Sequence, residues 1–207
     1  MKLHESPSPN ARRVHVFMAE KGLADKGVEI ERVAVDIRGG ENLTPDYKAK
    51  NPAGRVPVLE LDDGTFIGES VAICRYLEAL HPEPNLFGTT PMEVALIEMW
   101  QRRAELNFML NVAMAFRNIT GFFKDRETPV KEFGEVSAVV AAEFVPMFDA
   151  QLSKTQFLAG ANFSIADITL AVAWGFAQQV KVVELPAAPN VERWLTEVNA
   201  RPSFSAS

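Results

Sequence analysis

Residues 51–77 read NPAGRVPVLELDDGTFIGESVAICRYL, and they contain the clearest run of structural signals in the chain. A compact apolar segment at 57–61 opens with a proline and predicts a strand at the edge of a sheet. The residues at 62–64 are Asp-Asp-Gly, a turn sequence, so we expect the segment 65–67 to return antiparallel and complete a hairpin. Apolar residues then recur at helical spacing after Ser70, which predicts a helix capped by that serine.

The chain before this hairpin alternates strand and helix signals. A short apolar start around Leu3 precedes a serine–proline pair at 8–9 and a run of helical periodicity. Residues 28–35 (VEIERVAV) alternate apolar and polar side chains, as a strand buried on one face does. A threonine–proline pair at 44–45 opens a short helix. We therefore expect an α/β domain with the order β-α-β-α-β-β-α over residues 1–81.

The second part of the chain is predicted to be entirely helical. Residues 82–90 hold two prolines and a glycine, a composition typical of a connector. We expect helices from Pro91 to about 118, from the pair Thr128-Pro129 to about 152, after a capping box at Ser164 to Asp167, and from Asn190. An all-helical domain is therefore predicted for residues 91–207.

Composition excludes several classes of protein. The 207 residues are 47% hydrophobic and 23% charged, which is enough apolar material for folded domains and excludes general disorder. A formal net charge of −6 argues against nucleic-acid binding. No apolar run approaches the roughly 20 residues of a membrane span, and the start of the chain does not read as a signal peptide, so we expect a soluble, cytoplasmic protein without membrane contact. One cysteine, Cys74, excludes an internal disulfide, and three widely separated histidines argue against a metal site.

Two features of the hairpin region predict binding chemistry. Proline cannot donate a ladder hydrogen bond, so the backbone of Val56, next to Pro57, is expected to be available to an extended peptide. The helix N-terminus at Ser70 offers unpaired N–H groups that suit a carboxylate, and Glu69 is placed to hold an ammonium group. Together they suit an amino-acid head group, and the alternative is a simple serine cap beside an exposed glutamate.

These segments, taken together, resemble the cytosolic glutathione transferases. The likeness rests on NPAGRVPVL at 51–59, Asp63-Gly64, IGES at 67–70, Ile73, Tyr76-Leu77 and the SIAD motif at 164–167. It implies a thioredoxin-like domain followed by an all-helical domain. It also implies reduced glutathione as co-substrate without a metal, a homodimer, and a role in detoxification.

The resemblance assigns roles around the hairpin. It implies a cis peptide bond between Val56 and Pro57, with the Val56 backbone paired to the cysteinyl unit of glutathione. Glu69 and Ser70 would bind the γ-glutamyl end. Arg55, where relatives often have Gln or Lys, is the candidate for the glycyl carboxylate.

Activation of the glutathione thiol is assigned to the loop before the first helix. A thiol with a pKa near 8.5 is mostly protonated at neutral pH, and lowering that pKa by about two requires roughly 2.7 kcal/mol of selective stabilisation. Ser6, Ser8 and Asn10 all lie in this loop. The resemblance places Ser8 at the position of the serine-type hydroxyl, with Asn10 as the second candidate. The run Ser-Pro-Asn is also similar to the Thr-Pro-Asn of nu-class relatives, which are glutathione-dependent disulfide reductases.

The same loop lacks the signatures of other classes. It has no tyrosine, no cysteine of the omega or beta type, and no Ser-Ser-Cys-x-Trp of the zeta-class isomerases. We expect the electrophile pocket between the two domains, lined by the long helix after Pro91. Trp100, Phe108 and Asn111 are the candidates, although most apolar residues of such a helix pack in a core.

The predicted function is therefore a glutathione transferase that adds the thiolate of glutathione to a small apolar electrophile. One alternative is a glutathione-dependent disulfide or peroxide reductase. Another is a binding protein that keeps the fold without catalysis.

Overall fold

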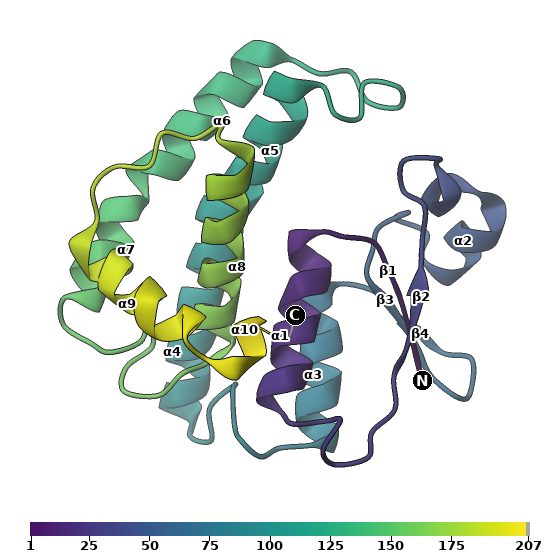
Figure 1. Cartoon of the computed structure of the whole chain (residues 1–207), viewed down its shortest axis with the longest axis horizontal. Helices are drawn as coiled ribbons and strands as arrows, with labels where there is room; N and C mark the ends of the chain where they lie inside the picture. Colours follow the sequence, from purple (N-terminus) through teal and green to yellow (C-terminus); the bar gives the residue numbers. More distant parts are fainter. Residues whose placement is uncertain (206–207) are drawn as a thin grey trace. The chain divides into compact units, whose positions relative to one another are not determined.

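The computed structural model describes residues 1–205, which divide into two compact units (Figure 1). The first unit contains Met1–Asn85 together with residues 202–205, and the second contains Leu86–Arg201. The division falls inside the segment predicted as a connector, and the predicted limits of the two domains stay predictions.

The first unit is a small mixed sheet with helices packed on it. Its strand order is β2-β1-β3-β4, with β1 and β2 parallel and the other pairs antiparallel. Helices α1 and α3 lie side by side, and α2 lies on the other side of the sheet (Figure 1). The elements are β1 (Lys2–Glu5), α1 (Pro9–Glu20), β2 (Glu31–Ala34), the 3-10 helix η1 (Glu41–Leu43), α2 (Pro45–Lys50), β3 (Val58–Glu60), β4 (Phe66–Ile67), α3 (Ser70–Leu80) and α10 (Pro202–Ser205).

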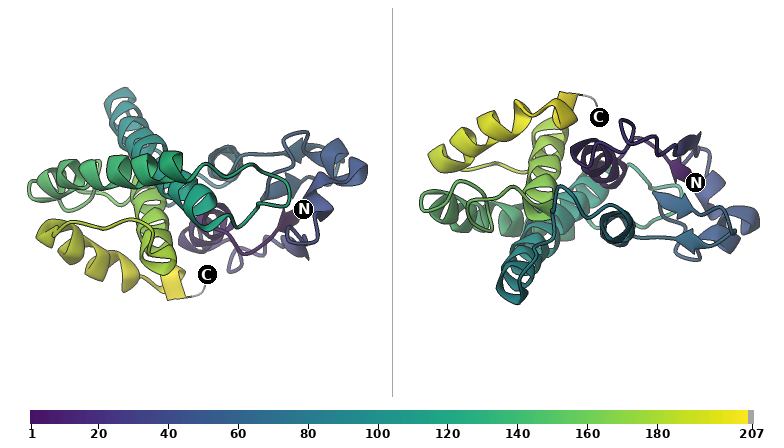
Figure 2. Two further views of the ribbon diagram at one scale, coloured as in Figure 1. Left: turned by 90° about the horizontal axis from the view of Figure 1, so that it is seen from above. Right: turned by 90° about the horizontal axis from the view of Figure 1, so that it is seen from below.

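The second unit is built from helices. Its first helix is long and continuous, because α4 runs through a π-helical segment, η2, directly into α5. Helix α5 packs against α6 (Figure 2). The elements are α4 (Pro91–Arg102), η2 (Arg103–Met109), α5 (Leu110–Thr120), α6 (Lys131–Glu143), α7 (Val145–Leu152), α8 (Ile165–Val180) and α9 (Pro189–Asn199). In the part of the chain that the structure describes, no helix has the length and apolar character needed to cross a bilayer.

Polar caps start α1, α2, α4 and α8 where the sequence predicts them. Ser8 Oγ accepts a hydrogen bond from the Ala11 backbone N–H at 3.2 Å, and Thr44 caps α2 in the same way. Thr90 and Ser164 each begin a complete capping box, at α4 and α8. These caps fix the helix starts because the first N–H groups of a helix have no partner inside it.

Some predicted boundaries were wrong. Thr128 does not cap a helix: α6 begins at Lys131 after Val130, whose N–H donates to Asn118 Oδ1 at 2.9 Å. The predicted continuous helix to about residue 152 is two helices, α6 and α7, with Phe144 between them.

The start of α3 and the extent of β2 also differ from expectation. Ser70 is the first residue of α3 rather than its cap, and Glu69 occupies the cap position without a side-chain hydrogen bond. Strand β2 covers only Glu31–Ala34 of the predicted run 28–35. The short helix α10 was not predicted.

Candidate functional site

The loop before α1 lies beside the approach to β3. In the ladder between β1 and β3, His4 pairs with Val58. Because the two strands run antiparallel, continuing the same register places Ser6 beside Val56. The sheet topology therefore brings the loop that is predicted to activate the thiol and the predicted peptide-pairing residue to the same end of the sheet.

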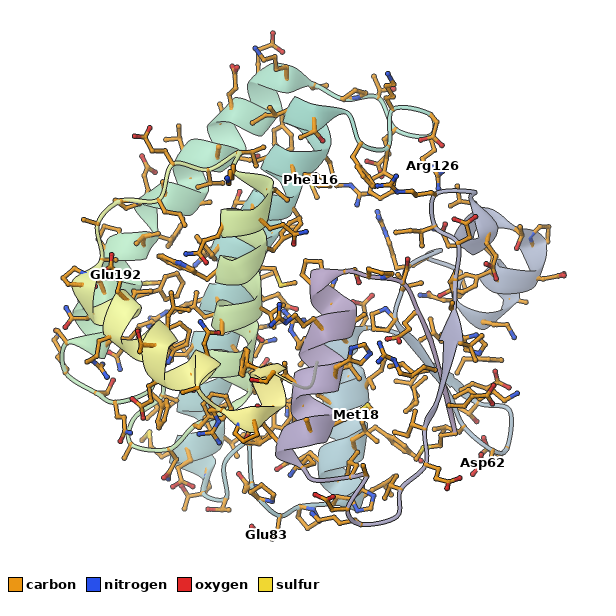
Figure 3. All side chains as sticks on the ribbon, in the orientation of Figure 1. Met18, Asp62, Glu83, Phe116, Arg126 and Glu192 are labelled. Atoms are coloured by element: carbon orange, nitrogen blue, oxygen red, sulfur yellow. The ribbon has the colours of Figure 1, made fainter. Side chains whose placement is uncertain are left out.

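The start of α3 reaches that end as well. In the ladder between β3 and β4, Leu59 pairs with Ile67, the last residue of β4, and the chain then runs through Gly68 and Glu69 into α3. The turn between these strands, marked by Asp62 in Figure 3, lies at the opposite end of the sheet. The first unit thus gathers its three candidate segments in one place although they are far apart in the sequence.

Ser8 occupies the N-cap of α1 in a conformation suited to donating a hydrogen bond. Its backbone is extended, its side chain is half-buried, and its Oγ accepts from Ala11 N–H. Within residues 1–205, the Ser8 hydroxyl donates its own hydrogen to no protein acceptor. The O–H is therefore available to an anion at the positive end of the α1 dipole.

A polar network joins the start of α1 to the start of α3. Ser70 Oγ accepts from Arg13 Nη1 at 2.7 Å and donates to Asn10 Oδ1 at 3.4 Å. Arg13 is fully buried, and Ser70 is 5% exposed, whereas Asn10 lies at the surface. Because the Ser70 hydroxyl is engaged with the protein, its backbone N–H is the group that α3 offers to a ligand.

Glu69 has an unusual backbone conformation. Its φ is +62°, one of two non-glycine residues with positive φ among the described residues. Such conformations cost about 1–3 kcal/mol and are concentrated at ligand sites. The side chain of Glu69 is exposed, and its carbonyl oxygen accepts from Ile73 N–H at 3.0 Å in the first turn of α3.

The segment before β3 has the predicted cis peptide bond between Val56 and Pro57. Among residues 1–205, the Val56 N–H and C=O have no backbone partner. Arg55 is exposed next to them. An unpaired backbone at a sheet end is the arrangement that accepts an extended peptide.

Sequence reasoning named Arg13 only as one of several cations available to an anionic ligand, and it did not foresee that Arg13 is buried and donates to Ser70. The signal was present, because Arg13 lies three residues before Val16 and four before Phe17, on the same buried face of α1. It also missed Tyr47 and Asn51, which lie behind Arg55 and are described below.

A second cluster of ionisable side chains, partly buried, lies beside the loop before α1. Glu5, the last residue of β1, is 7% exposed and accepts hydrogen bonds from His15 and, at 2.5 Å, from Arg32 Nε. Burial lowers the pKa of His15 below its ordinary value. The cluster ties β1, α1 and β2 together where the loop begins.

The three candidate pocket residues of the second unit lie on α4, η2 and α5. Phe108 is fully buried and stacks on Trp174, with ring centroids 5.5 Å apart, and Trp100 is 6% exposed against Phe148. Asn111 is half-buried and donates to the Asn107 carbonyl oxygen at 2.8 Å. The two aromatic residues pack in the core of their own unit, so a direct role with an electrophile stays a prediction.

Cys74 is a core residue of α3. It is fully buried, and burial raises the pKa of its thiol to about 12. Its sulfur is therefore protonated and out of reach of substrates. Among residues 1–205, no group of three or more metal-ligating side chains is placed to hold an ion.

The first unit, with its β-α-β-α-β-β-α order and its cis-proline before β3, defines a thioredoxin-like domain, and the second is all-helical. Residues 7–80 match a family model described as glutathione S-transferase, N-terminal domain, and residues 113–202 match glutathione S-transferase, C-terminal domain. Three similar proteins support both matches over nearly the whole chain.

Glutathione S-transferase 2 of Saccharomyces cerevisiae is 35% identical over 206 residues, which cover 98% of this chain and 87% of the relative. A crystal structure of a glutathione S-transferase domain-containing protein from Marinobacter aquaeolei has a TM-score of 0.93 at 38% identity, covering 99% of this chain and 100% of the other. A Gtt2-class glutathione S-transferase from Vibrio parahaemolyticus has a TM-score of 0.85 at 41% identity, covering 100% and 96%.

The chain belongs to the glutathione S-transferase family. This membership confirms the predicted fold, a thioredoxin-like domain with an all-helical domain, and the predicted class of enzyme, a glutathione transferase.

Proposed function

We propose that this chain binds reduced glutathione at the sheet end of its first unit and transfers it to a small apolar electrophile, with Ser8 stabilising the thiolate. The observation that carries the proposal is the Ser8 hydroxyl, which caps α1 and still has its hydrogen to donate. The thiol first releases its proton to water, because the stabilised thiolate has a lowered pKa. The thiolate then attacks the electrophilic carbon, a carbon–sulfur bond forms, and the leaving group departs with its electron pair.

The proposed contacts divide glutathione into three parts. The cysteinyl unit pairs with the unpartnered backbone of Val56, beside Pro57. The γ-glutamyl end places its carboxylate on the N–H groups at the start of α3, from Ser70, and its ammonium group near Glu69. The glycyl carboxylate is paired with the exposed guanidinium of Arg55.

One hydrogen bond from Ser8 and the N-terminus of α1 together can supply the free energy needed to lower the thiol pKa. Lowering a thiol pKa from about 8.5 by about two corresponds to roughly 2.7 kcal/mol. A hydrogen bond to a charged group contributes about 1.5–3 kcal/mol, and a helix N-terminus adds about 0.3–1 kcal/mol. Asn10, exposed two residues after Ser8 and bonded to Ser70, is the second candidate.

We further propose an electrophile pocket that includes Asn111, with Trp100 and Phe108 as the aromatic core behind it. No metal takes part, and the enzyme acts in the cytoplasm in detoxification. A homodimer is supported by the apolar side chains that α6 leaves exposed, with Phe133 51% and Val136 60% exposed. Exposed apolar surface of this kind is covered in stable assemblies.

The test is conjugation of glutathione with a chlorodinitrobenzene by the wild type and single variants. Ser8→Ala is expected to lower kcat/KM by about 10²-fold while leaving the dissociation constant for glutathione within about threefold. Ser6→Ala and Asn10→Ala are matched variants of the same loop. An unchanged rate in Ser8→Ala removes Ser8 from the mechanism, and a larger loss in either neighbour reassigns the role.

The alternative of a disulfide reductase is favoured by the run Ser8-Pro9-Asn10. Because the Cys74 thiol is buried and protonated, such a reaction requires two glutathione molecules, one forming a mixed disulfide and one releasing oxidised glutathione. Turnover of a small disulfide that is faster than conjugation, and unchanged in Cys74→Ser, is the result that selects this alternative.

A further inference from the structure

Two side chains donate hydrogen bonds to one carbonyl oxygen in the segment before β3. Tyr47 Oη and Asn51 Nδ2 each lie 2.9 Å from the Arg55 carbonyl oxygen. Tyr47 is 3% exposed and Asn51 is 9% exposed, so both hydrogen bonds are made in the interior. A carbonyl oxygen has two lone pairs, and here side chains rather than the sheet use both.

Neighbouring hydrogen bonds hold the rest of the segment in place. Asn42 Nδ2 donates to the Gly54 carbonyl oxygen at 2.7 Å. The Asn51 side-chain oxygen accepts from Ala53 N–H at 3.1 Å, and its carbonyl oxygen accepts from Gly54 N–H at 2.8 Å. Two consecutive carbonyl groups are therefore held by side chains from η1, from α2 and from the residue that ends α2.

The Arg55 carbonyl and the Val56 N–H belong to one peptide group. That group is planar and trans, so fixing the direction of its C=O fixes the direction of its N–H on the opposite side. The Val56 side chain packs against the buried cluster that contains Tyr47. The two donors and this packing therefore hold the unpartnered Val56 N–H in a single orientation.

We propose that Tyr47 and Asn51 are positioning residues for glutathione, because they preset the backbone N–H that pairs with its cysteinyl unit. The inference rests on the proposed function of Val56. Both side chains act from behind the peptide group, so their loss weakens glutathione binding and leaves the chemical step unchanged. Burial raises the pKa of Tyr47 to about 12, so its hydroxyl remains a donor across the working range of pH.

Tyr47→Phe tests the proposal because it removes one donor and keeps the ring. Calorimetric titration with reduced glutathione is expected to show a dissociation constant about fivefold higher than in the wild type, the fold-change of one hydrogen bond. KM for glutathione rises in parallel, whereas kcat and the pKa of the bound thiol stay at their wild-type values. The control is Tyr76→Phe, the chain's other tyrosine, half-buried on α3, which leaves all four quantities unchanged.

Asn51→Asp is the second variant, since it loses the donor to Arg55 and keeps the acceptor for Ala53. If Tyr47→Phe does not unfold cooperatively, Asn51→Asp tests the proposal with the same four measurements. The inference is overturned if the folded variants bind glutathione with the same dissociation constant as the wild type. It is also overturned if their affinity is unchanged while kcat falls or the pKa of the bound thiol shifts. A wild type that binds no glutathione refutes the proposed function itself, and this inference with it.

Discussion

Replacing Asp167 by asparagine removes a fully buried carboxylate on which four hydrogen bonds converge. Its Oδ1 accepts from Leu158 N–H at 2.9 Å and from Trp194 Nε1 at 3.0 Å. Its Oδ2 accepts from the backbone N–H and the hydroxyl of Ser164, both at 3.0 Å. In Asp167→Asn, an NH2 group turned toward Leu158 and Trp194 loses both of those hydrogen bonds. An NH2 group turned toward Ser164 loses only the bond from the Ser164 backbone N–H, because the Ser164 hydroxyl can rotate and accept from it.

The cost depends on pH because the carboxylate titrates in the folded state. Burial raises the pKa of Asp167 from 3.8 to about 6. Between these values the folded protein binds more protons than the unfolded chain, so the contribution of Asp167 to stability falls as pH rises from about 4 to about 6. The difference between the two pKa values corresponds to about 3 kcal/mol.

These terms give the size of the effect. Near pH 4 the wild-type carboxyl group is protonated and neutral, so the variant loses about one neutral hydrogen bond, about 1 kcal/mol of unfolding free energy. At pH 7 the wild type loses about 3 kcal/mol of stability because it buries a charge, whereas the variant does not. The variant is therefore expected to be about 2 kcal/mol more stable than the wild type at pH 7.

The assay is urea unfolding of both proteins, followed by circular dichroism, at several pH values between 4 and 7. Asp25→Asn, an exposed aspartate after α1, is the control and is expected to change the unfolding free energy by less than about 0.5 kcal/mol at every pH. A cost of Asp167→Asn that is constant over this range, or that increases as pH rises, refutes the reasoning.

Two further substitutions test other parts of the fold. Gly54→Ala introduces a Cβ 2.9 Å from the Asn42 carbonyl oxygen, at a residue with φ +61°. We therefore expect the free energy of unfolding in urea to fall by about 2 kcal/mol, together with weaker glutathione binding. An unfolding free energy equal to that of the wild type would contradict this expectation. Lys21→Met removes a fully buried ammonium that lies 2.5 Å from both Glu78 Oε2 and the Pro84 carbonyl oxygen, and a loss of about 3 kcal/mol is expected in the same measurement; a loss below about 1 kcal/mol would show that the ion pair is not needed.

The helix starts and the sheet order follow from local signals in the sequence. Caps such as Ser8 and Thr90 satisfy N–H groups within their own helix, so a few adjacent residues are enough to predict them. Thr128 has the same local pattern with the following proline, but Asn118, from the preceding helix, satisfies the Val130 N–H and moves the start of α6. Hydrogen bonds of this kind, between residues that are distant in the sequence, cannot be predicted from a few adjacent residues.

The contiguous motifs of the site could be predicted from the sequence, but the contacts between residues that are distant in the sequence could not. The motif around Val56 and the segment at Glu69 are contiguous in the sequence, whereas the Arg13 contact to Ser70 joins residues 57 positions apart. The positive φ of Glu69 displaces Ser70 from the cap position, and a serine before a helical run gives no sign of that. The double hydrogen bond on Arg55 likewise depends on how α2 ends, not on any motif.

The most direct test of the proposed mechanism is the pKa of the glutathione thiol while it is bound to the enzyme, measured by the ultraviolet absorbance of the thiolate in wild type and in Ser8→Ala. The wild-type complex is expected to have a glutathione thiol pKa of about 6.5, against about 8.5 for the free thiol. In the Ser8→Ala complex we expect the thiol pKa to rise to about 7.5 or higher. A bound thiol whose pKa is the same in both proteins would contradict the role assigned to Ser8.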